Sequence, residues 1–501
     1  MKNFIDKHLN KINIGLIVLI AIAPLLLCFN SSLWFDEAYS VGIAKQPWEN
    51  LFISTINDVH PILYYVLLKI YSLICGTSVI ALRIFSVIPI VLLAVFSFVK
   101  IRKEFGNKVS FYFNLVLLLL PVTMHYGSQI RMYSLSMLFV TITAVYAYLA
   151  YKNNTKKDWV IFAIASICSA YTHYFALFTI GIINILLLFF IIREKKELLK
   201  RWFIYGAIQI VCYLPGAVIF IMQATRVSKG FWISVNYPEI ITQIIEFFFL
   251  DCINSGYPAV FGLFIVIYMI LRVHKLYLED KKKIRPVTIA LTTCGLVILV
   301  TLLVSLKRAV FIPRYMLPML GLFIFAFAYI LAVEKSRIVK TIIIIGLIGL
   351  TIWNGVTLWD KSYSAENNKP IEAIQAEVKP EDIFVYTTIG PSSSVAINFD
   401  ENKQYFYNKD NWTVEKAYGA FAPQMKVVNN LDEIQNYIGR IWVIDAGDTN
   451  MYDYINEMEG TTVIKDKETY YHPFSGDTFI ISLFENCLLY TSPSPRDRSL
   501  S

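Results

Sequence analysis

Apolar runs of about twenty residues recur along most of this chain and limit the folds that are open to it. Two examples are VSFYFNLVLLLLPVTMHYG at residues 109–127 and VTIALTTCGLVILVTLLVSL at residues 287–306. A helix of about 20 residues crosses a bilayer core of about 30 Å, and its backbone satisfies its own hydrogen bonds there. Hydrophobic residues make up 56% of the 501 residues and charged residues only 16%. The sequence therefore predicts an all-α polytopic membrane protein.

The net charge of +8 does not indicate a nucleic-acid partner. The basic residues form short clusters between apolar runs, which is the distribution of signals that orient membrane helices. The seven cysteines are scattered, mostly inside apolar runs, without the paired spacing of disulfide frameworks or zinc sites. We expect them to be packing residues.

The basic clusters also predict the topology. They lie at residues 1–11, 100–108, 152–158, 193–201, 271–285 and 334–340. If all of them face the cytoplasm, an even number of crossings separates each neighbouring pair. The run at 61–75 is short and contains Lys69, so we expect it to lie along the outer interface or to re-enter the membrane. The segment 159–192 has basic loops on both sides, so it must form two crossings, with His173 at the outer turn between them. About eleven crossings result.

The chain is expected to contain three regions. Residues 1–358 form the transmembrane domain, residues 359–485 a small extracytoplasmic α/β domain, and residues 486–501 a non-native tail whose composition changes abruptly. In the second region, PIEAIQAEV and MYDYINEME suggest helices, and DIFVYTT, KQYFYN, RIWVIDA and TFIISLF suggest strands.

Under this topology, polar side chains collect on the outer side of the membrane. They occur in the segments SSLWFDEAYSVG, NDVHP, HYGSQIRMYSL, YTHY and KRAVFIPRYMLP. The candidate site residues among them are Asp36, Glu37, Asp58, His60, Gln129, Arg131, Tyr133, His173, Arg314 and Tyr315.

This grouping suits group transfer from a phosphate-bearing lipid of the outer leaflet. A carboxylate can accept the proton of an attacking hydroxyl, and arginines can bind a departing phosphate through charge-assisted hydrogen bonds. Each residue also has a structural interpretation: an acidic pair outside a span is often only solvated, a histidine at a helix break often caps it, and arginines at span ends reach headgroups. Divalent metal binding by Asp36, Glu37, Asp58, His60 and His173 is chemically compatible, but no spacing requires it, so the metal requirement stays unknown.

The order of these motifs carries a family likeness. WFDEAYSVG, then DVHPILYYVLLKIYSLICGTSVIALRIFSVIP, then LLLPVTMHYGSQIRMYSLSMLF, then YTHYFAL and finally FIPRYMLPML follow one another along the chain. This arrangement resembles the GT-C membrane glycosyltransferases, and within them the group of protein O-mannosyltransferases and bacterial lipid A aminoarabinose transferases. The likeness covers about residues 10–335.

The resemblance implies a function and a set of roles. It implies an inverting transferase that takes a sugar from a polyprenyl phosphate and passes it to an acceptor lipid, glycan or protein, with Asp36 and Glu37 catalytic and Asp36 the general base. It further implies that His60, Gln129, Arg131 and Tyr133 line the donor pocket and that Arg314 and Tyr315 belong to the phosphate site. The family often has two prolines after the histidine, whereas here HPI has one.

Two other classes of function remain open at this stage. A lipid or glycan transporter or flippase would also be polytopic and basic, but it would place ionisable groups near the bilayer midplane and often shows repeat symmetry. A non-catalytic scaffold leaves the outward Asp, His and Arg group without a role. The abundance of Ile, Lys and Asn favours a bacterial source, and the multi-pass topology predicts a cell-membrane location.

Overall fold

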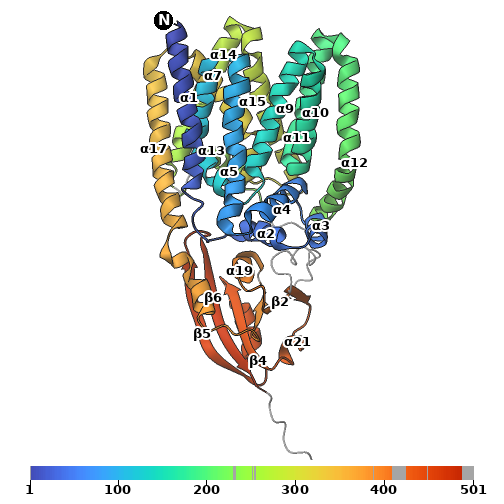
Figure 1. Cartoon of the computed structure of the whole chain (residues 1–501), viewed down its shortest axis with the longest axis vertical. Coiled ribbons are helices and arrows are strands. Elements are labelled where there is room, and N and C mark those ends of the chain that lie inside the picture. The colour runs from blue at the N-terminus through green and yellow to red at the C-terminus, as the bar shows by residue number, and fades with distance from the viewer. Residues whose placement is uncertain are drawn as a thin grey trace, which may run out of the picture. The chain divides into compact units, whose positions relative to one another are not determined.

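A computed structural model of the chain describes residues 2–229, 233–250, 252, 255–387, 389–408, 425–447 and 449–487. Of the predicted tail 486–501, all but the first two residues lie outside this range. The chain divides into two compact units (Figure 1). The helical unit comprises Met1–Asn30 and Val59–Asp360, and the sheet unit comprises Ser31–Asp58 and Lys361–Ser501. Residues 31–58, which the sequence analysis assigned to the transmembrane domain, thus group with the C-terminal sheet.

Long apolar helices build the helical unit, as the apolar runs predict. Among the described residues, nine helices are long and apolar enough to cross a membrane, or ten if the bent pair α7 and α8 counts as one span. They are α1 (Lys2–Leu25), α5 (Val79–Phe96), α9 (Tyr133–Asn153), α11 (Tyr174–Glu194), α12 (Leu199–Lys229), α14 (Tyr257–Glu279), α15 (Lys281–Ser305), α16 (Leu320–Val333) together with the preceding 3₁₀ segment Pro313–Met319, and α17 (Arg337–Ser362), with the pair α7 (Asn107–Leu119) and α8 (Pro121–Ser128). The sequence predicts one more crossing, and its segment forms α10 (Lys156–Thr172), which is shorter at 17 residues.

Shorter segments connect these helices. They are α4 (Leu63–Cys75), the π-helical turn η1 (Ser97–Ile101), α6 (Arg102–Phe105), η2 (Lys196–Leu198), η3 (Tyr237–Glu239), α13 (Ile240–Phe249) and η4 (Pro313–Met319). At 13 residues, α4 is too short to span a bilayer, as expected from its sequence, and it packs against α5 and α10. The expected break in YTHY is also present, because His173 is extended between α10 and α11.

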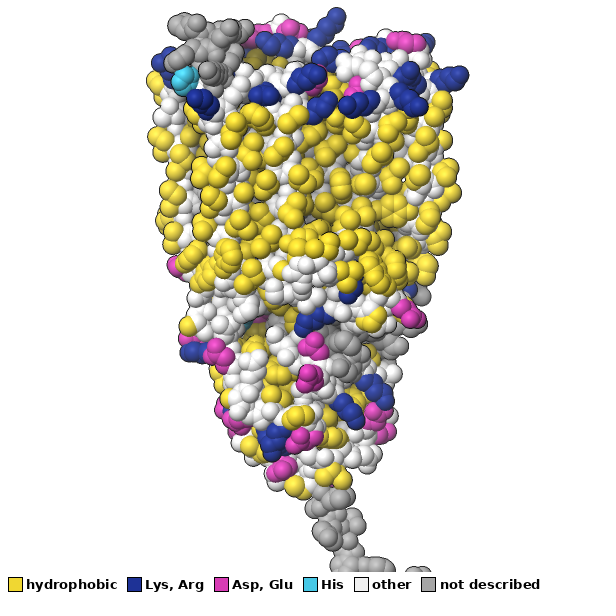
Figure 2. Space-filling model, viewed as in Figure 1, with side chains coloured by type: hydrophobic (Ala, Val, Ile, Leu, Met, Phe, Trp, Pro, Cys, Tyr) yellow, Lys and Arg dark blue, Asp and Glu magenta, His cyan; other side chains and the backbone are white. Residues whose placement is uncertain are grey.

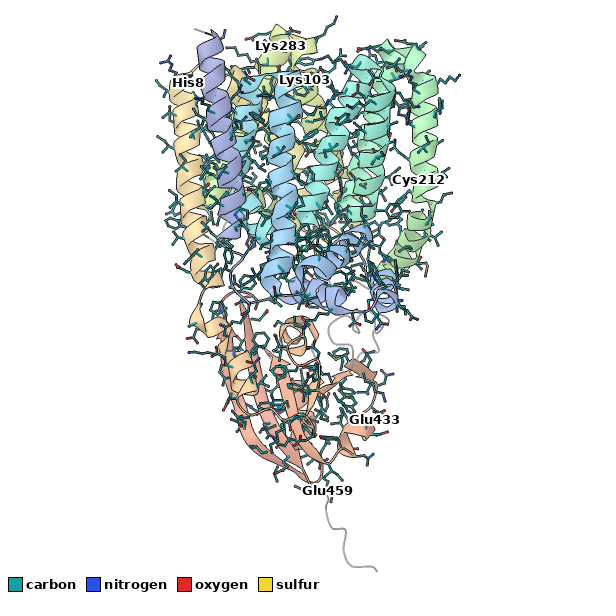
Figure 3. The ribbon with its side chains drawn as sticks, in the orientation of Figure 1. His8, Lys103, Cys212, Lys283, Glu433 and Glu459 are labelled. Atoms are coloured by element: carbon teal, nitrogen blue, oxygen red, sulfur yellow. The ribbon has the colours of Figure 1, made fainter. Side chains whose placement is uncertain are left out.

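Basic clusters gather at one end of the helical unit. Figure 2 shows Lys and Arg concentrated beyond one edge of the apolar belt, and Figure 3 places His8, Lys103 and Lys283 at that end. Ion pairs join the loops there, with Lys152 Nζ 3.2 Å from Glu104 Oε2 and Arg285 Nη1 2.7 Å from Glu194 Oε2. Loops that are far apart in sequence therefore share one end of the bundle.

The sheet unit is a small α/β structure. Its six-stranded sheet has the order β3-β2-β1-β4-β6-β5, in which β1, β2, β3 and β4 pair in parallel and β6 is antiparallel to both β4 and β5. The strands are β1 (Ile383–Tyr386), β2 (Lys403–Tyr407), β3 (Met425–Val428), β4 (Gly439–Ala446), β5 (Thr461–His472) and β6 (Asp477–Asn486). The helical elements are α2 (Phe35–Lys45), α3 (Trp48–Asn57), η5 (Ala365–Asn367), α18 (Lys369–Gln375), α19 (Ile389–Ala396), α21 (Asp432–Gln435) and α22 (Asn450–Asn456).

The core of this unit lies between the sheet and its helices. Ile383 and Val385 of β1 and Ile441 and Val443 of β4 are buried together with Met451 and Ile455 of α22. These strands read as continuous apolar runs, which is typical of strands buried on both faces. The four strands and two helices that the sequence predicts are present, whereas β3, β5, α19 and α21 were not predicted.

The N-terminal loop joins the sheet unit through α2. This helix packs against α19, and Lys45 Nζ donates to the carbonyl oxygen of Ile397 at 2.9 Å while pairing with Asp400 at 3.1 Å. Residues near the start of the chain therefore depend for their packing on residues near its end.

Candidate active site

Helix ends position a cluster of basic and aromatic side chains in the helical unit. His60 lies just before α4, Arg131 lies two residues before α9, His173 caps α11, and Arg314 and Tyr315 lie in η4. We call His60, Arg131, Tyr133, His173, Arg314 and Tyr315 the basic cluster.

Arg131 is the most deeply buried charge of the basic cluster. Its side chain is 1% exposed, its Nη1 donates to Tyr65 Oη at 3.3 Å, and its Nη2 lies 3.1 Å from His60 Nε2. A guanidinium can only donate hydrogen bonds, so His60 Nε2 must accept this one and the imidazole carries its proton on Nδ1.

His173 presents a donor inside the cluster. The side chain is 3% exposed and its Nδ1 accepts from the backbone N–H of Phe175 at 3.1 Å. Burial lowers the pKa of His173 well below its usual value, and electrostatic interactions with His60, Arg131 and Arg314 lower this pKa further. The ring is therefore neutral with its proton on Nε2. This Nε2 is buried and makes no hydrogen bond within the described structure.

Aromatic rings enclose the two histidines. The ring of His173 lies 6.4 Å from His60, 5.9 Å from Tyr133 and 5.4 Å from Tyr315, measured between centroids. Tyr126 lies 5.3 Å from Tyr133 and extends this wall. The cluster is thus a low-dielectric setting in which charges act more strongly than in water.

The helix dipoles have the same sign as the side chains. Residues of the cluster stand at or just before the N-termini of α4, α9, α11 and η4. A helix N-terminus carries partial positive charge and free N–H groups, and both favour anions. Two guanidiniums, a buried imidazole N–H and several helix N-termini together make a site suited to a phosphate.

Comparisons with known proteins agree with the predicted family. Residues 59–219, which contain His60, Arg131 and His173, match the family model described as dolichyl-phosphate-mannose-protein mannosyltransferase. The resemblance to GT-C membrane glycosyltransferases is confirmed. Among curated proteins, none is significantly similar to the chain in sequence.

Two solved structures of ArnT share the fold of this chain at low sequence identity. ArnT from Cupriavidus metallidurans bound to undecaprenyl phosphate has a TM-score of 0.62 at 11% identity, covering 96% of this chain and 99% of that one. The apo state of ArnT gives the same TM-score and identity over 94% and 97% of the two chains. The archaeal oligosaccharyltransferase AglB from Archaeoglobus fulgidus, in complex with an inhibitory peptide and a dolichol-phosphate, has a TM-score of 0.48 at 11% identity over 86% and 69%.

The other predicted site residues lie in two places. Gln129 lies beside the basic cluster, where its Nε2 is 2.9 Å from His125 Nε2 and its backbone oxygen accepts from the N–H of Arg131 at 2.7 Å. Asp36 and Glu37 form the first turn of α2 in the sheet unit and are 8% and 0% exposed. Asp58 ends α3 in the same unit, where its N–H bonds to Ser54 and Thr55. Asp36, Glu37 and Asp58 therefore belong to the sheet unit, whereas the residues of the basic cluster belong to the helical unit.

Sequence reasoning missed two neutral hydrogen-bond partners within the candidate site. Tyr65 bonds to Arg131, and Gln223 of α12 donates from Nε2 to the His60 carbonyl oxygen at 3.5 Å while accepting from Tyr174 Oη at 2.5 Å. A polar Gln inside a long apolar helix is a signal that could have identified Gln223. Tyr65 gives no such signal, since tyrosine is common at membrane interfaces. Within the described ranges, no three His, Cys, Asp or Glu side chains are arranged to hold a metal ion.

Proposed function

We propose that this protein moves a sugar from a polyprenyl-phosphate donor to an acceptor hydroxyl, with inversion, on the extracytoplasmic face of a cell membrane. The observation that carries the proposal is the basic cluster, in which a buried guanidinium and a buried imidazole N–H share one site. Its hydrogen-bond donors match the oxygens of a phosphate. The fold shared with ArnT, whose structure was solved with undecaprenyl phosphate, supports a polyprenyl carrier.

The proposed chemistry divides between the two groups of residues. Asp36 accepts the proton of the acceptor hydroxyl while that oxygen forms a bond to the anomeric carbon of the donor. The bond from the anomeric carbon to the phosphate oxygen breaks, and the oxygen keeps the electron pair. Arg131, Arg314 and the N–H of His173 stabilise the resulting polyprenyl phosphate anion, so no separate acid is required. Attack opposite the departing phosphate inverts the anomeric centre.

The remaining candidate residues have supporting roles in this proposal. Burial of Glu37 beside Asp36 holds the proposed base in a desolvated helix turn. Asp58, Gln129, Tyr133 and Tyr315 are proposed to contact donor or acceptor. Clustering of Lys and Arg at one end of the helical unit supports an extracytoplasmic site, since the positive-inside rule places that end in the cytoplasm.

The first experiment replaces the proposed base. Purified protein is supplied with extracted polyprenyl-phosphate sugars, and mass spectrometry follows sugar transfer and the release of free polyprenyl phosphate. We expect Asp36→Asn to lower turnover by about 10²-fold or more, because general-base catalysis contributes about 10²–10⁴-fold. The matched control is Asp432→Asn, which changes another first-turn aspartate of the sheet unit.

Each result of this experiment decides between functions. Wild-type turnover in Asp36→Asn would exclude Asp36 as the base.

Arg314→Ala should raise the KM for donor more than that for acceptor, and an equal change in both would argue against a phosphate role. Movement of intact donor across the bilayer with no release of polyprenyl phosphate would instead support a flippase.

A further inference from the structure

A pocket in the sheet unit stands next to the proposed catalytic helix. It has a volume of about 340 Å³ and is lined in part by Ser31, Ser32 and Leu33. This volume lies within the range of small-molecule sites, about 300–1,000 Å³. None of the residues that the reaction above uses lines the pocket, so its chemistry needs a separate explanation.

Part of the pocket lining is buried and apolar. Leu33, Val395 and Phe479 contribute buried apolar surface there, and His472 is buried beside Phe479 with a centroid distance of 5.7 Å. Apolar side chains of this kind can pack against the C–H face of a sugar ring, as aromatic and aliphatic surfaces do in many small-molecule sites.

The rim of the pocket is polar and nearly free of charge. Asn368, Gln375 and Asn398 supply amide groups, Ser31 supplies a hydroxyl, and Glu372 supplies the one carboxylate of the lining. No Lys or Arg is among the lining residues. Amides both donate and accept hydrogen bonds, which is the pattern that neutral hydroxyl-rich ligands require.

His472 is consistent with a neutral ligand. Its Nδ1 accepts from the backbone N–H of Ser475 at 3.2 Å, so the neutral ring carries its proton on Nε2. Burial lowers the pKa of His472 to about 4, which keeps the ring uncharged at neutral pH. A phosphate would therefore find no cation in this pocket, whereas the basic cluster offers several.

The pocket is close to the proposed base along the chain. Ser32 precedes Asp36 by four residues, and four extended residues span at most about 14 Å. A ligand that contacts Ser31 and Ser32 therefore lies on the order of 14 Å or less from the start of α2. Both the pocket and α2 belong to the sheet unit, so this proximity does not depend on the helical unit.

We propose that this pocket binds a neutral sugar residue of the acceptor, so that the acceptor of the transferase is a glycan or glycolipid. The role of the ligand as acceptor rests on the proposed function, whereas binding of a saccharide to the pocket can be tested independently of it. The pocket binds the sugar unit next to the one that is modified. Binding there places a hydroxyl of the modified unit at Asp36, the proposed base.

The experiment measures binding of neutral saccharides to the full chain in detergent. The probes are methyl glycosides of common hexoses and short neutral oligosaccharides, detected by saturation-transfer NMR and by photo-crosslinking with peptide mapping. We expect crosslinks to residues 31–33 or 368–375. Gln375→Ala should weaken binding about three- to tenfold, which corresponds to one or two lost hydrogen bonds.

A matched control exists within the same unit. Gln435 is also an exposed glutamine at the last residue of a short helix, but it does not line the pocket, so Gln435→Ala should leave binding unchanged. Equal binding by both variants, crosslinks elsewhere, or no binding of any probe would overturn the saccharide site.

A second measurement separates this inference from the proposed function. Undecaprenyl phosphate binding should be unaffected by Gln375→Ala and should weaken in Arg314→Ala, whereas saccharide binding should show the opposite pattern. If only the saccharide measurement fails, the acceptor subsite is wrong and the proposed donor site stands. If only the undecaprenyl phosphate measurement fails, the proposed donor site is wrong and the saccharide site stands.

Discussion

At the scale of single residues, the protonation state of the histidines defines what each site can bind. His173 accepts at Nδ1 and so directs an N–H into the basic cluster, where Arg131 already contributes positive charge. A protonated His173 would add a third cation and would lose the acceptor that caps α11. Burial prevents this, and the helix cap and the anion site therefore depend on the same neutral ring.

His472 gives the sheet unit a predictable pH dependence. Its pKa falls from about 6.5 when unfolded to about 4 when folded, so the unfolded chain binds more protons between these values. Its contribution to stability is complete above about pH 6.5 and is lost progressively as pH falls towards 4. At pH 5 the loss is on the order of 2 kcal/mol.

Hydrogen exchange can check this prediction with His472→Asn, whose amide oxygen can still accept from Ser475. Comparison of the two proteins at the same pH cancels the intrinsic exchange rate. Amides of β5 and β6 in the wild type should exchange up to about thirtyfold faster relative to the variant at pH 5 than at pH 7. A ratio that does not change with pH would show that His472 does not titrate in this window.

At the scale of elements, the break between α7 and α8 shows how side-chain hydroxyls can replace backbone donors where the helical unit bends. The two helices meet at 66°, with Pro121 at the first position of α8. Pro121 has no N–H, so the Leu117 carbonyl loses its regular helical partner. The hydroxyl of Thr123 replaces it at 2.5 Å, and Thr351 of α17 donates to the Leu119 carbonyl at 2.6 Å.

Replacing Thr123 should therefore be costly. Thr123→Val keeps the shape but leaves the Leu117 carbonyl without that donor, and we expect the free energy of unfolding to fall by about 1–3 kcal/mol. Thr179→Val is the matched control, because the hydroxyl of Thr179 bonds to the Phe175 carbonyl inside the regular helix α11. Denaturation of both variants in mixed detergent micelles measures the difference in the free energy of unfolding. Equal stability of the two variants would show that the Thr123 hydroxyl does not replace the missing backbone donor.

Element prediction succeeded where apolar runs were long and failed where strands were short or polar. The membrane helices are legible because about twenty apolar residues have few other folds open to them. Strand β3 is only MKVV, and β5 reads TTVIKDKETYYH, with charges that suit an edge strand but hide its pattern. The sequence placed His60, Arg131, His173 and Arg314 on one side of the membrane. It could not show that Tyr65 and Gln223 contact them, because this depends on how each helix is rotated.

At the scale of the whole molecule, the basic end predicts the orientation in the membrane. In a cysteine-free background, Lys103→Cys should resist a membrane-impermeant maleimide applied to intact cells, and should react once the membrane is opened. Tyr237→Cys, between α12 and α13, should react in intact cells, because one crossing separates it from the basic loop before α12. The reverse labelling pattern would invert the topology and move the proposed site to the cytoplasmic side.

The packing of α2 against α19 has a consequence for how the protein is made. Lys45 and its partner Ile397 are 352 residues apart. At synthesis rates of about 5–20 residues per second, the ribosome needs on the order of 20 to 70 s to connect them. The helix that carries Asp36 and Glu37 is thus synthesised long before α19, against which it packs. A chain that stops short of residue 389 contains every candidate membrane helix among the described residues and the whole basic cluster, yet it lacks α19, against which α2 packs. Completion of translation is therefore a condition for assembling both halves of the proposed chemistry.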